Sequence, residues 1–141
     1  MYKLTEDFYH KWHLGPSSGY EYREIAWSIG ALRKEKPGFT RNRIVDWITG
    51  LAYVKQHYFS ENLYLSVAFY GDPEGKEKVY KYLFYDFDSK ENPELALRKG
   101  LEFASSLKKR YGIEPILVES GHKGLHVIVP LKKPIREHSI Y

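Results

Sequence analysis

The segment from residue 79 to 129 constrains the fold most, because it places a well-delimited helix between apolar strand-like runs. Asn92 is a favoured N-cap residue, Pro93 suits the first helical position, and Gly112 is a typical residue just after a helix. The flanking apolar segments predict strands at residues 79–87, 116–119 and 125–129. We therefore expect a strand–helix–strand–strand unit. The helix would bury a stripe of Leu97, Leu101, Ala104, Leu107 and Tyr111.

The remaining segments predict a second group of elements. A first helix would be capped by Thr5 and would bury the apolar line of Leu4, Phe8 and Trp12. Alternation predicts strands at residues 20–29 and 62–70. A helical apolar pattern runs from residue 40 to 58, through Ile44, Trp47, Ile48, Leu51 and Val54. A last helix would begin at Pro134.

Composition narrows the class of protein. The chain has 141 residues and a net charge of +4, which is spread along the sequence without a basic tail. Cysteine is absent, and this excludes disulfides, thiolate metal sites and thiol catalysis. No apolar run approaches the length of a membrane-spanning helix, and the N-terminus is too polar for a signal peptide. We expect a cytoplasmic protein with no membrane partner.

The first motif with chemical potential is Asp86-Phe87-Asp88, at the end of an apolar strand. Because side chains alternate along a strand, both carboxylates would point to one face and Phe87 to the other. Adjacent carboxylates repel each other unless a cation lies between them, and Mg²⁺ prefers such oxygen ligands. The two carboxylates form half of a two-metal site, or the strand simply ends in two solvated acids.

The second motif is Ser120-Gly121-His122-Lys123-Gly124-Leu125-His126, between two predicted strands. Its glycines would permit positive φ angles, so that successive N–H groups converge on an anion. Ser120, Lys123 and His126 would add a hydroxyl, a charge and a ring nitrogen. The alternative is an ordinary hairpin with a satisfied strand histidine.

In this order the two motifs resemble the archaeo-eukaryotic primase superfamily, in which a hydrophobic-D-x-D motif precedes an S-G-x-x-G-x-H motif. Two upstream segments, 22–27 and 63–70, are similar to earlier strands of primase small subunits. The resemblance covers about residues 20 to 131. It implies an α/β fold of the primase catalytic core: an N-terminal αβ unit at residues 1–60 and a partial RRM-like sheet at 61–141.

The resemblance also implies a function, namely template-dependent nucleotidyl transfer by two Mg²⁺ or Mn²⁺ ions. The substrates would be an NTP or dNTP and a DNA template, and further primase or replication subunits are possible partners. Asp86 and Asp88 would be the catalytic metal ligands, while Ser120, Lys123 and His126 would hold the nucleotide phosphates. Nucleotide or nucleic-acid contacts are expected from Arg23, Tyr70, Arg41 and Arg43.

The chain departs from the family pattern in two respects. It lacks the cysteine-containing zinc module of primase small subunits, which favours the plasmid, viral or ligase-associated branches. The family has a third acid on a later strand, whereas Glu137 is the only acid after His126. We therefore expect either the N-terminal part of a longer enzyme or a subunit without complete catalysis. If the chain is itself complete, Glu119 or Glu137 would have to supply the third acid.

Two other functions remain open. The chain would then be a non-catalytic primase-like subunit that binds nucleotide or nucleic acid, or an RRM-like module with Tyr64 and Tyr70 stacking on RNA bases. A basic group could follow a template backbone or form a solvated loop; it consists of Arg33, Lys34, Lys36, Arg41 and Arg43.

Overall fold

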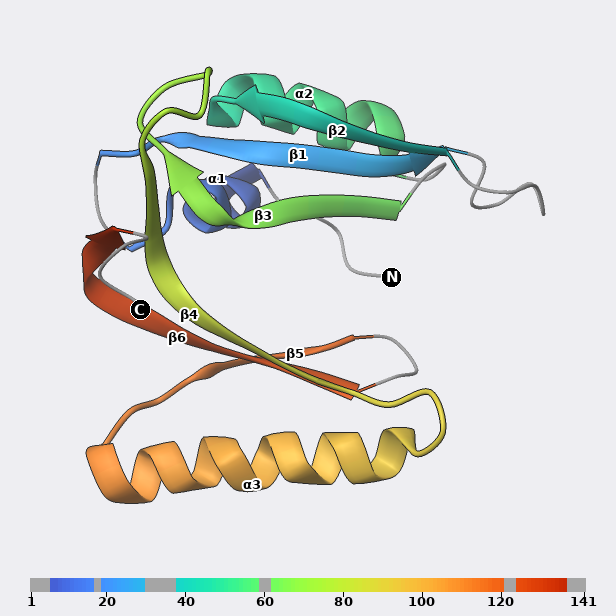
Figure 1. The fold of residues 1–141 in the computed structure, drawn as a ribbon, viewed down its shortest axis with the longest axis vertical. Coiled ribbons are helices and arrows are strands. Elements are labelled where there is room, and N and C mark those ends of the chain that lie inside the picture. The colour runs from blue at the N-terminus through green and yellow to red at the C-terminus, as the bar shows by residue number, and fades with distance from the viewer. Residues whose placement is uncertain (1–5, 17–18, 30–37, 59–61, 121–123, 137–141) are drawn as a thin grey trace. The chain divides into compact units, whose positions relative to one another are not determined.

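The computed structural model describes residues 6–16, 19–29, 38–58, 62–120 and 124–136 (Figure 1). Its elements are of mixed α/β type, as expected. In chain order they are α1 (Glu6–Leu14), β1 (Tyr22–Ile29), β2 (Gly38–Val45), α2 (Trp47–His57), β3 (Asn62–Tyr70), β4 (Lys78–Asp88), α3 (Pro93–Tyr111), β5 (Ile116–Glu119) and β6 (Gly124–Arg136).

The chain divides into two compact units, and each is described by itself. Residues 1–81 with 132–141 form unit 1, and residues 82–131 form unit 2. Strands β4 and β6 therefore contribute residues to both units. These boundaries lie at different residues from the division that the sequence suggests near residue 60.

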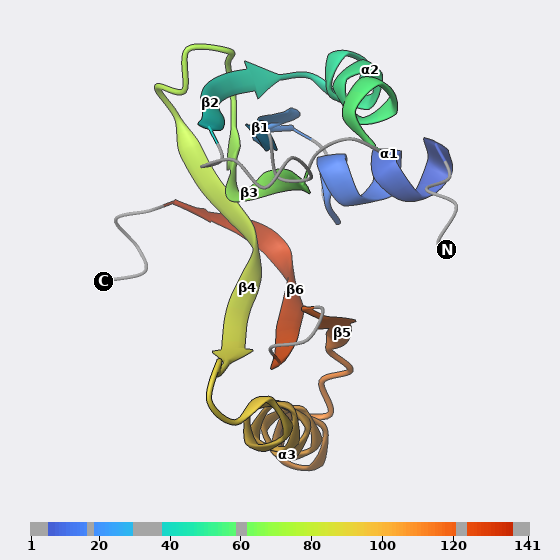
Figure 2. The ribbon, with the colours of Figure 1, turned by 90° about the vertical axis from the view of Figure 1, so that its right-hand side faces the viewer.

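Unit 2 has the predicted strand–helix–strand–strand order (Figure 1). Strand β6 lies between β4 and β5, and its residues 125–128 pair antiparallel with β5. The Asn92 side chain caps α3 by accepting a hydrogen bond from Leu95 N at 3.1 Å. Gly112 ends the helix in the left-handed conformation, with φ at 65°. Figure 2 shows α3 end-on beside the strands of this unit. The predicted caps and strands are confirmed.

The buried stripe of α3 differs from the predicted one. Leu101 and Tyr111 are 46% and 69% exposed, so their predicted burial is wrong. Ala104 is buried as predicted, and the other buried residues of the helix are the small Ala96 and Gly100. A Cβ on Gly100 would lie 2.9 Å from Leu125 Cδ2, so glycine allows the helix to pack closely on β6. Leu97 and Leu107 pack at the sides of this contact.

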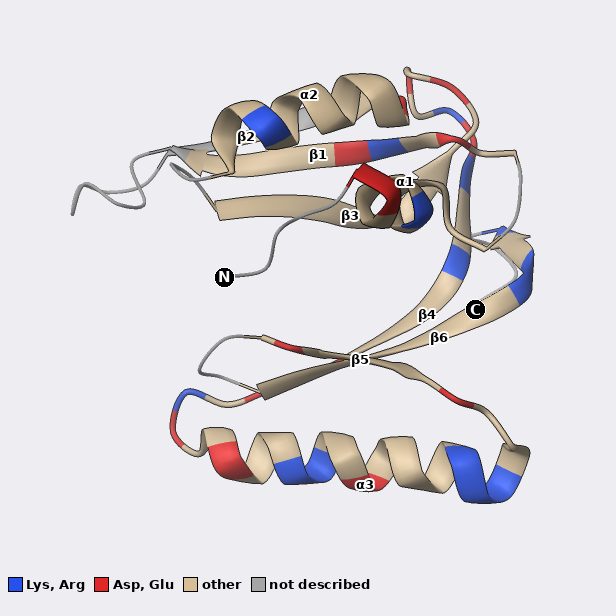
Figure 3. Ribbon diagram, turned by 180° about the vertical axis from the view of Figure 1, so that it is seen from behind, with Lys and Arg blue, Asp and Glu red and all other residues tan. Residues whose placement is uncertain are grey.

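The charges on α3 follow its dipole. Glu94 lies in the first turn, and the last turn carries Lys108, Lys109 and Arg110 (Figure 3). Acidic side chains near the N-terminus and basic ones near the C-terminus stabilise a helix.

Among the described residues, no helix is both long enough and apolar enough to cross a lipid bilayer.

Unit 1 contains the strand order β2–β1–β3–β4, with α1 and α2 packed on β1. The predicted strands at residues 20–29 and 62–70 are present as β1 and β3. Both helices cover the same face of β1, because one core cluster joins Tyr9, Ile25, Trp27, Leu51 and Val54. Ile25 and Trp27 are the buried residues that β1 contributes to this cluster.

The buried face of α1 is not the predicted one. Phe8 is 56% exposed, whereas Tyr9 and His13 are buried and contact each other, with 3.1 Å between Tyr9 Oη and His13 Nδ1. These rings have apolar bodies, and the pairing satisfies two of their polar atoms. Thr5 and Leu4, named as cap and first apolar residue, lie outside the described residues.

The C-terminal end of α1 receives two buried cations. Arg23 Nη1 donates to Trp12 O at 2.7 Å, and Lys81 Nζ donates to Leu14 O at 2.6 Å. Both cations also lie over the Phe69 ring. Helix C-termini leave carbonyls without helical partners, and these cations supply donors to them. Burial lowers the pKa of Lys81 to about 8.

The helix predicted over residues 40–58 is wrong in its first part. Residues 38–45 form β2, which pairs antiparallel with β1, and α2 begins only at Trp47. Asp46 separates the two elements, because its Oδ1 atom accepts a hydrogen bond from Thr49 N at 2.8 Å. This is an N-cap contact, and it marks the true start of the helix.

The helix predicted from Pro134 is also wrong, because β6 continues to Arg136. The pairing of β6 with β5 ends at Ile128, so β5 leaves one edge of β6 free beyond that residue. Proline is tolerated in strands at such edges, where its missing N–H is not needed. Glu137 lies outside the described residues.

Candidate functional site

The last part of β4 presents two different faces within unit 2. Tyr85 and Phe87 contact Phe103 of α3, with ring centroids 4.8 and 5.5 Å apart. Strand alternation therefore directs Phe84, Asp86 and Asp88 to the face opposite α3. The contact of Asp86 with His126 agrees with the predicted separation of Asp86 from Phe87. We call the face opposite α3 the acid face.

His126 of β6 lies on the acid face beside Asp86. Its Nε2 atom is 3.6 Å from Asp86 Oδ1, and its ring centroid is 4.9 Å from that of Phe84. Asp86 is exposed and His126 is half-buried, so a ligand can reach both from solvent. Because β4 and β6 are neighbours in the sheet, the two motifs meet through adjacent strands.

Gly124 sets how closely the second motif approaches the first. A Cβ on this residue would lie 1.7 Å from Phe87 O and 3.2 Å from Asp88 Cα. The main chain at the start of β6 thus packs directly on the Asp86–Asp88 segment. The sequence argument for a positive φ is wrong at Gly124, since the positive-φ glycines do not include it. Glycine is needed there for close approach.

Ser120 follows β5 directly. Its backbone N–H donates to Gly124 O, at the start of β6, at 3.1 Å. Its Oγ atom is buried and has no hydrogen-bond partner among the residues that the structure describes. A buried hydroxyl without a partner costs free energy, which a bound acceptor or donor would recover. Gly121, His122 and Lys123 lie outside the described residues.

Glu119 lies on the α3 side of the sheet. It pairs in register with Leu125, which belongs to the core cluster under α3. Directly opposite residues of an antiparallel pair share one face. The register therefore separates Glu119 from Asp86, and it disfavours Glu119 as a third acid.

The donor set on the acid face is small. Within the described part of the chain, no group of three or more His, Asp or Glu side chains is arranged to hold a metal ion. Asp86 and Asp88 provide two exposed carboxylates, and no described residue forms an ion pair with Asp88. Hard divalent ions accept such a pair when water or phosphate oxygens fill the other positions, so the residues fit Mg²⁺ or Mn²⁺.

Arg23 is placed inside the packing of unit 1. Its Nε and Nη2 atoms donate to Ser66 O, and its Nη1 atom donates to Trp12 O. Its guanidinium also lies 4.5 Å from the Phe69 ring centroid. All three nitrogens therefore donate to main-chain carbonyls, which favours a structural role over the expected ligand contact.

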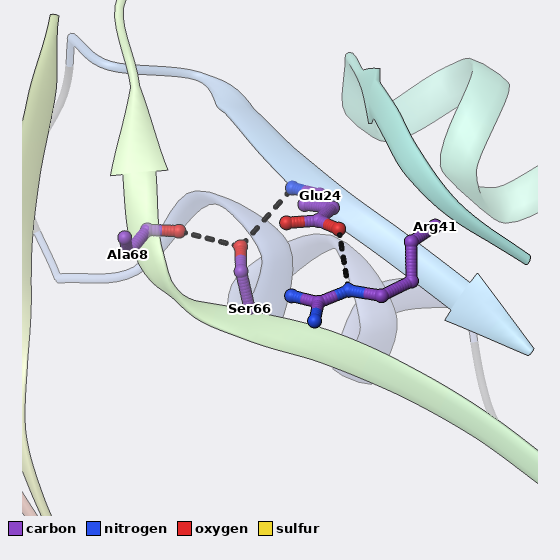
Figure 4. Close-up of polar contacts among 4 residues, drawn as sticks. All are labelled: Glu24, Arg41, Ser66 and Ala68. Carbon is purple, nitrogen blue, oxygen red and sulfur yellow. Dashed lines mark hydrogen bonds and ion pairs between the residues drawn. The ribbon is translucent and has the colours of Figure 1, made fainter. Parts of the chain in front are cut away.

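The other predicted contact residues also belong to unit 1. Arg41 is exposed and its Nε atom lies 3.3 Å from Glu24 Oε1 (Figure 4). Figure 4 also shows Ser66 Oγ between Glu24 N and Ala68 O, at 3.0 and 2.6 Å. This contact lies where the register of β1 and β3 shifts.

The remaining predicted contact residues of unit 1 differ in exposure. Arg43 is exposed on β2, Tyr64 is exposed on β3, and Tyr70 is half-buried at the end of β3. Arg33, Lys34 and Lys36 lie outside the described residues.

Phe84 is a residue of the acid face for which the sequence predicted no role. It is 39% exposed and contacts His126. The same alternation that groups Asp86 with Asp88 includes residue 84, so the signal was present in the strand period.

Comparisons of the chain with protein-family models, curated proteins and solved structures found no match.

Proposed function

We propose that this protein is a primase-polymerase type nucleotidyltransferase that copies a DNA template from NTP or dNTP substrates. One observation carries the proposal: Asp86, Asp88 and His126 gather on one exposed face of adjacent strands. The sequence resemblance assigns these residue types to metal and phosphate binding. Their gathering on one face is what such a site requires.

Asp86 and Asp88 would hold the divalent ions. Their carboxylates are exposed, lie on one face, and are two residues apart on β4. When bound, Mg²⁺ or Mn²⁺ would stabilise the charge that develops on the reacting phosphate oxygens. The strand provides the fixed spacing of the two acids, and α3 packs behind it through Phe87.

Ser120 and His126 would bind the phosphates of the nucleotide. The Ser120 hydroxyl is free, within the described chain, to donate to a phosphate oxygen. The His126 Nε2 atom lies beside Asp86, so a phosphate held there would be next to the carboxylate that holds the metal. Phosphoryl transfer depends mainly on such positioning and on charge stabilisation. Lys123 remains a proposed third contact.

A primer-extension assay with Mn²⁺ tests the proposal. Asp86→Asn should lower the extension rate roughly 10³-fold or more, because one ligand of the metal site is lost. The matched control is Glu102→Gln, which removes a carboxylate from the exposed surface of α3, where Glu102 pairs with Lys99. Extension by Asp86→Asn at the control rate would overturn the proposal.

The same assay separates the non-catalytic alternative. A wild-type protein that binds Mn²⁺–nucleotide without extending a primer, and loses this binding in Asp86→Asn and His126→Ala, would be a primase-like binding subunit. The RRM-like alternative predicts that RNA binding survives both substitutions. Two carboxylates would repel a phosphate backbone, so the RNA would not bind at Asp86 and its loss would not weaken binding.

A further inference from the structure

The acid face carries an exposed apolar area beside its charged groups. Phe84 is two residues before Asp86 on the same face of β4. Across β6, Val118 of β5 pairs in register with His126 and therefore shares that face. Phe84, Val118 and the neighbouring Ile116 are each partly open to solvent. A ligand at this face would meet carboxylates at one end and an aromatic ring at the other.

The separation between these two ends is defined by the strand. Residues two apart on a strand lie about 6.6 Å from each other. A phosphate chain held by metal at Asp86 and by His126 would leave the rest of its molecule to extend along the face. A nucleotide combines a charged phosphate chain with a flat apolar base several ångströms away, and so it matches both ends.

Phe84 has the geometry of a stacking residue. Its ring contacts the His126 imidazole in a tilted arrangement, with an interplanar angle of 53° and a centroid distance of 4.9 Å. The ring remains 39% exposed. Bases stack on exposed aromatic rings without regard to their identity, since every base has a π-face.

We infer that Phe84 carries the base of the incoming nucleotide, an inference that rests on the proposed function. Phe84 would then distinguish a nucleoside triphosphate from a bare polyphosphate, and it would do so for all four bases.

The test compares two ligands by titration calorimetry in the presence of Mn²⁺: ATP or dATP, and inorganic tripolyphosphate. Phe84→Ala should weaken nucleotide binding about tenfold or more, the range that loss of one stacking contact produces. Its affinity for tripolyphosphate should stay within about twofold of the wild type, since stacking contributes nothing to that ligand. Phe84→Tyr should retain nucleotide affinity.

Two further variants control for folding and for loss of apolar surface. Phe84→Leu keeps an apolar side chain against His126 but lacks the flat ring, and it should also bind nucleotide more weakly. Leu101→Ala removes an exposed apolar side chain from α3 and should leave both affinities unchanged.

The outcomes separate this inference from the proposed function. Unchanged nucleotide affinity in Phe84→Ala and Phe84→Leu overturns the role of Phe84 alone. Equal weakening of nucleotide and tripolyphosphate also overturns it, because Phe84 would then act only by positioning His126. A wild-type protein that binds neither ligand overturns the proposed function and this inference together.

Discussion

His126 Nε2 lies 3.6 Å from Asp86 Oδ1, although a whole helix and a strand separate the two residues in the chain. The contact arises because β6 inserts between β4 and β5, which brings the second motif against the first. Neighbouring carboxylate and imidazole groups on an open face are what the proposed metal–phosphate site requires.

Mn²⁺ should stabilise the wild-type protein, and Asp88→Asn should abolish that stabilisation. A ligand that binds only the folded state stabilises the protein by RT ln(1 + [L]/Kd), and so it raises the melting temperature. Without metal, Asp88→Asn should melt at or slightly above the wild-type temperature, because a repulsion between neighbouring carboxylates is removed. Thermal melting with and without Mn²⁺ measures both effects. Equal metal-induced shifts in the two proteins would contradict a metal site at Asp88.

Ser120→Ala should change stability and ligand affinity in opposite directions. The Ser120 hydroxyl is buried without a partner among the described residues, so its removal should leave the free energy of unfolding equal or raise it by up to about 1 kcal/mol. Nucleotide affinity should fall by about 1–3 kcal/mol, the scale of a hydrogen bond to a charged group. Urea unfolding and titration calorimetry provide the two values. A variant that is less stable but binds normally would show a structural hydroxyl.

Gly124→Ala should be strongly destabilising. The added Cβ would lie 1.7 Å from the Phe87 carbonyl oxygen, and a main-chain atom cannot move aside as a side-chain end can. We expect a loss of about 3 kcal/mol or more in the free energy of unfolding, at or above the upper range of overpacking. Gly112→Ala is the control, because residue 112 has a left-handed φ but open space around its Cβ, and the substitution should cost about 1–2 kcal/mol. A smaller loss for Gly124→Ala than for Gly112→Ala would contradict the close approach.

Arg23→Met should reduce stability and spare nucleotide binding. The substitution keeps an apolar stem over Phe69 but removes the donors to the carbonyls of Trp12 and Ser66. Buried acceptors without partners should lower the free energy of unfolding by about 3 kcal/mol. Binding is measured on the folded fraction. If the variant has normal stability but binds nucleotide weakly, Arg23 makes the ligand contact that the family resemblance implies, and the structural role is wrong.

His13 should make folding stability depend on pH below neutrality. Burial, together with the nearby Arg23 charge, lowers the pKa of His13 from 6.5 to about 4. Because the unfolded chain binds this proton more readily, the stability contribution is complete above pH 6.5 and is lost as the pH falls towards 4. The loss amounts to about 3 kcal/mol over that range. In His13→Gln, the free energy of unfolding measured in urea should depend less steeply on pH between these limits. Above pH 7 it should differ from the wild-type value by a constant amount. Parallel curves at all pH values would contradict the assignment.

The parts of the fold that sequence predicted are those with local signals. Asn92, Pro93 and Gly112 delimit α3 because caps act over one or two turns. The alternation of Asp86, Phe87 and Asp88 needs only the strand period. Both inferences therefore depend on neighbours in the chain.

The parts that failed depend on tertiary partners. Residues 40–45 fit a helical pattern, but pairing with β1 makes them a strand, and the Asp46 side chain caps the helix that follows. Ala104 is buried as the pattern predicts, but Ala96 and Gly100 lie outside the predicted stripe, because close helix–sheet packing selects small residues that hydrophobic patterns ignore. The burial of Arg23 follows from carbonyls that only the folded chain brings together.

Gly124 packs against the main chain of Phe87 and Asp88, so direct backbone contact holds the end of β4 against the start of β6. The spacing between the acids and the imidazole is then a property of two backbones in contact. Redesign for another ligand should therefore vary Phe84 or His126 and leave Gly124 untouched.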